Sequence, residues 1–79
     1  MKMATASFYV NGKKVGTLKV EISASLVKAL SAHAFYHVSV GDNIDQIVVD
    51  GISARSAGKI QRDVRAVYSA ISGVVVVAV

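Results

Sequence analysis

The 79-residue chain contains no cysteine, no proline and no tryptophan, and it has only five acidic residues. Without cysteine, no disulfide can crosslink the chain and no thiolate can bind a metal. No two of the acids form a convincing pair on one predicted element, and no residue set matches a nucleophile, base and orienting group. These acids are Glu21, Asp42, Asp45, Asp50 and Asp63. We therefore expect a protein that is not an enzyme and that carries no cofactor.

Long apolar segments are also missing. The longest apolar run, residues 73–79, is far shorter than the ~20 residues that a bilayer-spanning helix needs. Lys2 is not followed by an apolar segment and a small-residue cleavage site, so the sequence predicts no signal peptide. We expect a cytoplasmic protein without a membrane partner, or a small module of a virus or mobile element.

The chain is nevertheless rich in apolar residues, which make up 53% of the sequence. A chain this short buries only ~60% of the surface that its unfolded form exposes. No linker or repeat divides it, so residues 1–79 are expected to form one domain. Because polar residues are too few to cover that domain, we expect a homodimer or a higher homo-oligomer.

The N-terminal part predicts a β-hairpin. Residues 4–10 lead into Asn11-Gly12, a strong hairpin signal because both residues tolerate a positive φ. The return strand is expected at about residues 15–22, where apolar and polar residues alternate, and Gly16 is a candidate bulge. Lys13 and Lys14 lie at the hairpin tip. They are either a basic arm that reaches a nucleic acid or a lysine pair that protects a sheet edge.

A first helix is predicted to begin after Ser23 or Ser25, either of which can act as the N-cap. It should end before the turn cluster at residues 41–43, although residues 38–40 are also compatible with a short extended piece. Its apolar side consists of Leu26, Val27, Leu30, Ala34 and Val38. A strand is expected next, at residues 44–49.

Residues 53–72 predict a second helix with two opposed faces, capped by Ser53 or Ser56 and ended by Gly73. The apolar face repeats at i, i+4, i+7 and i+11, and the opposite face carries four cations. The apolar residues are Ile60, Val64, Val67 and Ile71, and the cations are Arg55, Lys59, Arg62 and Arg65. Such a row of cations can neutralise several phosphates of a nucleic acid. The alternative is that the four cations only form the solvated outer face of the helix. Asp63 is the only acid in this run, which favours a polyanion partner.

The sequence ends in VVVVAV, a run without polar alternation that is typical of a parallel strand covered on both faces. The predicted order is ββαβαβ, an α+β fold with a four-stranded mixed sheet and two helices on one face. The other sheet face would then need cover from a second chain.

Other motifs are weaker. Residues 50–56 form a Gly/Ser turn that is either a phosphate site at a helix start or an ordinary capped turn. His33 and His37 have the i, i+4 spacing of a metal pair, but no third ligand is evident, so we expect no metal site. We place both at a helix–helix or subunit contact beside Phe35 and Tyr36. The aromatic residues form no RNP-like stacking set, although Tyr9 could stack on a base.

From Leu18 to Val79 the chain resembles the Alba superfamily, in particular its sporulation stage V protein S branch. The resemblance lies in LKVEIS before the first helix, then in IDQIVVDGISARSAGKIQRDVRAVY, and finally in SGVVVVAV. Alba-like proteins are small basic dimers that bind DNA or RNA through loops at the helix starts and a β-hairpin arm. The resemblance therefore implies a dimeric nucleic-acid-binding protein with Arg55 and Lys59 as contacts.

The chain departs from the Alba pattern in two places. Only Ser23, Ala24 and Ser25 precede the first helix, where Alba proteins carry lysines. The hairpin arm would come from the N-terminal Lys13-Lys14 turn instead of a C-terminal hairpin. We expect phosphate contacts from Lys13, Lys14, Arg55, Lys59, Arg62 and Arg65 with little base readout. The alternative is a structural or assembly module that oligomerises through its apolar strands.

Overall fold

The computed structural model describes residues 2–79. Its elements are β1 (Met3–Val10), β2 (Lys13–Glu21), α1 (Leu26–Ser39), β3 (Gln46–Asp50), α2 (Ala54–Val67), the 3-10 helix η1 (Ser69–Ile71) and β4 (Val75–Ala78). The order ββαβαβ and the α+β class that the sequence predicted are confirmed.

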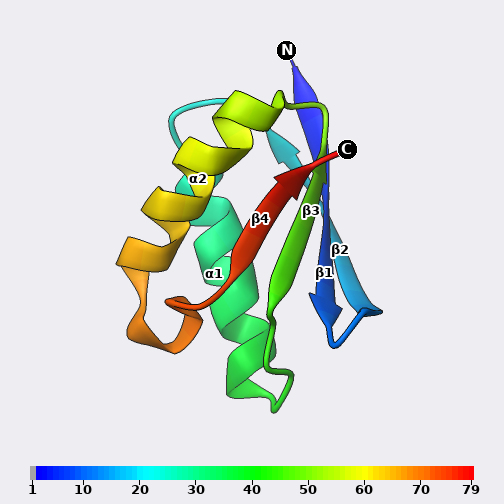
Figure 1. Ribbon diagram of the computed structural model, residues 1–79, viewed down its shortest axis with the longest axis vertical. Coiled ribbons are helices and arrows are strands. Elements are labelled where there is room, and N and C mark those ends of the chain that lie inside the picture. The colour runs from blue at the N-terminus through cyan, green and yellow to red at the C-terminus, as the bar shows by residue number, and fades with distance from the viewer. Residues whose placement is uncertain (1) are drawn as a thin grey trace.

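The four strands form one mixed sheet in the order β2-β1-β3-β4. β1 lies antiparallel to both β2 and β3, whereas β3 and β4 are parallel. Both long helices cover the same face of this sheet, and they run in the same direction (Figure 1). Each has 14 residues, and no helix in the described part of the chain is long and apolar enough to cross a membrane.

The hairpin between β1 and β2 has the predicted turn. Asn11 and Gly12 adopt φ values of 51° and 81°, and such a pair of positive values matches the right-handed twist of the strands. Phe8 pairs with Gly16, but Tyr9 pairs with Lys14, so Val15 is an extra residue on β2. The bulge therefore lies beside Gly16, as the sequence suggested.

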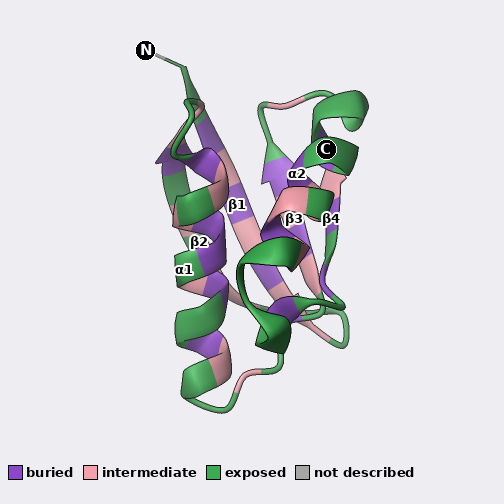
Figure 2. Cartoon of the chain, turned by 90° about the vertical axis from the view of Figure 1, so that its left-hand side faces the viewer, coloured by how far each residue is buried: buried purple, intermediate pink, exposed green. Residues whose placement is uncertain are grey.

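The hydrophobic core lies between the sheet and the two helices (Figure 2). Alternate strand residues face the helices because side chains alternate along a strand. The sheet contributes Ala4, Ala6, Phe8, Ile47 and Val49, and the helices contribute Leu30, Ala34, Ile60 and Val64. The fully buried Ser31 is satisfied within α1, where its hydroxyl donates to the Val27 carbonyl at 2.7 Å.

The prediction that the second helix continues to residue 72 is wrong. α2 ends at Val67, and Tyr68 is extended, with φ −133° and ψ 136°. η1 follows and turns Ile71 into the core, whereas Val67 remains 44% exposed. The sequence placed both Val67 and Ile71 on the apolar face because the spacing was applied to one continuous helix.

The prediction that the C-terminal strand is covered on both faces is also wrong. β4 is parallel to its neighbour, as expected, but it lies at the sheet edge, and Val75 is 40% exposed. On the open face of the sheet, Ser7 lies between Thr17 and Val48, and Val48 pairs with Val77. The open face is therefore polar towards β2 and apolar towards β4.

Candidate nucleic-acid interface

The start of α2 is fixed by its turn and its cap. Gly51 has φ 112°, and a side chain there would meet the Met3 carbonyl oxygen at 3.2 Å, so this position favours glycine. Ser53 is the N-cap, and its Oγ accepts a hydrogen bond from the Ser56 amide at 3.1 Å. The cap occupies one of the free N–H groups that a phosphate would use, which favours an ordinary capped turn.

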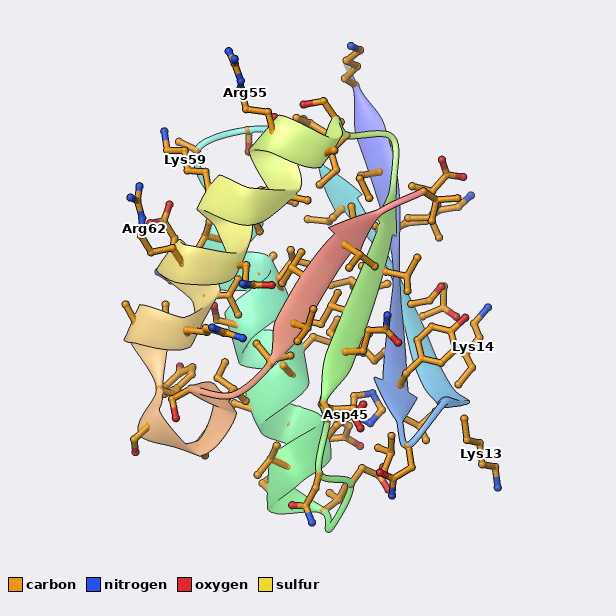
Figure 3. The ribbon with its side chains drawn as sticks, viewed as in Figure 1. Lys13, Lys14, Asp45, Arg55, Lys59 and Arg62 are labelled. Carbon is orange, nitrogen blue, oxygen red and sulfur yellow. The ribbon has the colours of Figure 1, made fainter. Side chains whose placement is uncertain are left out.

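The outer surface of α2 carries three cations. Arg55, Lys59 and Arg62 are exposed, and their positions span about 60° of the helix circumference. The buried residues Ala57 and Val64 lie on the opposite side of the helix. The three cationic side chains point away from the sheet (Figure 3). We call these three residues the basic face.

The basic face is poorly neutralised. Arg62 approaches the neighbouring Asp63 at 3.9 Å, a distance at which an exposed pair contributes little. Within residues 2–79, Arg55 and Lys59 take part in no ion pair. Their charges are therefore available to an anion from outside the chain.

Arg65, which the sequence placed with the other three cations, lies on a different side of α2. It is half-buried, and its Nε donates a hydrogen bond to the Val74 carbonyl oxygen at 2.6 Å. One turn earlier, the Gln61 Oε1 accepts a hydrogen bond from the Val76 amide at 3.0 Å. Val76 lies in β4 and Val74 directly precedes that strand, so Arg65 and Gln61 attach α2 to the outer edge of the sheet. The solvent-facing row consequently has three cations, not four.

Lys13 and Lys14 are both exposed at the hairpin tip. The tip is anchored by Asp45, whose carboxylate accepts a hydrogen bond from the Asn11 amide at 3.0 Å. The two lysines lie at the opposite end of the molecule from Arg55 (Figure 3). The structure thus does not bring the two sets of predicted cations together on one protomer.

A cavity of about 310 Å³ opens beside the basic face, between the start of α1 and the first half of α2. Its walls are mostly apolar, and its polar groups come from α2 and from the loop before α1. The apolar lining is formed by Ile22, Leu26, Val27, Ile52 and Ile60, and the polar lining includes Ser23, Ser56, Lys59 and Asp63. Lys59 is thus shared between the cavity and the basic face.

Sequence reasoning missed an aromatic pair at the other end of the helices. The rings of Phe35 in α1 and Tyr68 after α2 lie 4.5 Å apart at an interplanar angle of 32°. The two residues are 41% and 37% exposed. They are 33 positions apart in the sequence, so no local pattern could have paired them.

The two histidines do not lie at the predicted helix–helix contact. They face β1 and β2, where the rings of His33 and His37 lie 4.7 Å and 5.7 Å from that of Phe8. His37 is buried, and its Nδ1 lies 3.3 Å from the Asp42 carboxylate. Burial, and secondly the charge of His37, lower the pKa of His33. Among residues 2–79, no three His, Asp or Glu side chains are grouped to hold a metal ion.

No protein-family model, curated protein or solved structure matches the chain. The resemblance to the Alba superfamily therefore stays a prediction.

Proposed function

We propose that this chain is a small nucleic-acid-binding protein that acts as a homodimer and holds phosphates on its basic face. The observation that carries this proposal is the exposed row of Arg55, Lys59 and Arg62, of which only Arg62 has an acidic partner among residues 2–79. The net charge of +4 adds a favourable long-range field for a polyanion.

The proposed binding depends on charge more than on base sequence. Lysine and arginine contacts to phosphates position a protein on a nucleic acid but carry no sequence information. Each phosphate that is neutralised releases counterions, so binding weakens steeply as salt is added. Arg65 is left out of this contact set because its Nε is engaged by the Val74 carbonyl oxygen.

The hairpin tip serves as a secondary contact in this proposal. Lys13 and Lys14 are exposed and carry two positive charges, but the nearby Asp45 offsets part of that charge. Because the tip lies far from the basic face on the same protomer, it can reach only a distant part of a long nucleic acid or a second molecule (Figure 3).

The test compares two variants that lose the same charge at different places. The first is Arg55→Ala/Lys59→Ala/Arg62→Ala, and the control is Lys13→Ala/Lys14→Ala/Lys19→Ala. Each lowers the net charge from +4 by three. Fluorescence anisotropy with labelled oligonucleotides at low salt should show that the first variant loses at least tenfold more affinity than the control. Equal losses would mean that binding follows net charge and not the basic face.

An assembly module is the second candidate, and one observation favours it. The apolar half of the open sheet face, with Val48, Val75 and Val77, lies at the β4 end of the sheet. Such a patch can pair with a second copy. Sedimentation of the wild type and of Val75→Lys should then differ, because a lysine in the patch would dissociate the assembly. A monomer at high micromolar concentration would refute this candidate.

A further inference from the structure

We infer that the aromatic pair of Phe35 and Tyr68 is a stacking platform for an unpaired base, and that the protein prefers single-stranded nucleic acid. This inference rests on the proposed function and adds the strandedness of the ligand. The two rings lie against each other, and both side chains stay partly exposed. Base stacking on aromatic rings is the means by which many proteins hold single strands.

The platform lies at the end of the basic face. Tyr68 directly follows α2, whose last residue, Val67, lies about 7.5 Å beyond Arg62 along the helix axis. The other aromatic, Phe35, is brought to Tyr68 by the parallel course of α1 and α2 (Figure 1). One strand can therefore lay phosphates on the cations and turn a base towards the rings.

The geometry distinguishes a single strand from a duplex. In a duplex the base faces are covered by neighbouring pairs, so a protein reaches only the backbone and the base edges in the grooves. In a single strand the faces are free to stack on Phe35 or Tyr68. Stacking does not depend on base identity, since every base has a π-face. The platform is thus compatible with the low sequence specificity proposed above.

The cavity beside Lys59 is less suited to a base than the aromatic pair is. It contains no aromatic ring for stacking, and its charged groups, Lys59 and Asp63, have opposite signs. The aromatic pair, in contrast, combines exposure with a neighbouring row of cations.

The experiment distinguishes the contribution of the bases to binding from that of the phosphates. Three 15-nucleotide probes are compared by fluorescence anisotropy: an oligothymidine single strand, an abasic single strand with the same number of phosphates, and a mixed-sequence duplex. A uridine RNA strand of the same length serves as a fourth probe. The wild type should bind both base-containing single strands about 5- to 150-fold more tightly than the abasic strand, the range expected for one stacked base.

Two variants test whether the preference for base-containing strands depends on the rings of Phe35 and Tyr68. Phe35→Leu/Tyr68→Leu keeps apolar side chains but removes both rings, and it should reduce the preference for bases to less than threefold while the salt dependence remains. Tyr36→Leu removes an aromatic ring that is 59% exposed elsewhere on α1, and the preference should persist. Thermal unfolding of each variant confirms that it folds. If the double variant does not fold, the abasic comparison in the wild type still decides.

The inference is overturned if the wild type binds the abasic strand as tightly as the base-containing strands, or if it prefers the duplex. It is also overturned if the folded double variant keeps the preference for bases. Salt-dependent binding without a base preference leaves the proposed function intact. Absence of binding to every probe at low salt refutes both.

Discussion

Replacement of Gly16 by alanine should destabilise the protein through one contact. Gly16 lies in β2 beside the bulge, and its φ is not positive, so alanine meets no backbone penalty there. A Cβ at this position would lie 2.5 Å from the Nε2 of His37 and 2.8 Å from its Cε1. The imidazole must move, but it is buried and its Nδ1 is held by Asp42.

The expected cost follows from this overlap. Forcing one extra carbon into a well-packed site typically costs about 1–3 kcal/mol. In a domain of this size, each kcal/mol lowers the melting temperature by roughly 4–8 °C. Circular dichroism at 222 nm during thermal and urea unfolding of Gly16→Ala measures both quantities.

A double-mutant cycle tests whether His37 is the cause. His37→Ala removes the ring and leaves space beside Gly16, so alanine at position 16 should cost less than about 0.5 kcal/mol in that background. The coupling between the two sites should therefore exceed about 0.5 kcal/mol. The reasoning is refuted if Gly16→Ala is as stable as the wild type, or if its cost is unchanged when His37 is absent.

Three further predictions concern stability. Because burial and the charge of His37 lower the pKa of His33, the unfolded state binds more protons below pH 6.5, and the free energy of unfolding should fall as the pH drops from 7 to 5. His33→Gln should flatten that fall in urea unfolding at several pH values. Arg65→Ala leaves the Val74 carbonyl oxygen, directly before β4, without its donor and should cost about 1–3 kcal/mol in chemical unfolding, and an unaltered midpoint would contradict its role at the edge. Val64→Ala should cost about 2 kcal/mol and Val67→Ala less than about 0.5, and equal costs would contradict the observed end of α2.

The parts of the fold that the sequence predicted correctly are those with strong local signals. Asn11-Gly12 determines a turn through its own backbone preferences, independently of the rest of the chain. The cap at Ser53 and the apolar positions Ile60 and Val64 similarly define α2 within one segment. These features need no knowledge of the tertiary structure.

The wrong predictions concern features of the fold that tertiary contacts determine. The end of α2 at Val67 depends on η1, which brings Ile71 into the core by a route that helical spacing cannot predict. The exposure of Val75 depends on the strand order, which the sequence left open.

In the candidate site, too, local patterns were predicted correctly and tertiary contacts were not. A helical projection was sufficient to find Arg55, Lys59 and Arg62, since their exposure depends only on the opposite face being buried. It could not show that Arg65 reaches the edge of β4, because that requires the position of β4 beside α2. The contact between Phe35 and Tyr68 likewise depends on how two helices pack.

The salt dependence of binding tests the central claim most directly. Affinity for a single-stranded oligonucleotide is measured over a range of salt concentrations for the wild type and for Arg55→Ala/Lys59→Ala/Arg62→Ala. Three phosphate contacts predict a slope of about −2 in a plot of log affinity against log salt for the basic face alone. The account predicts that the variant loses about two units of slope. A wild-type slope near zero, or an unchanged slope in the variant, would contradict it.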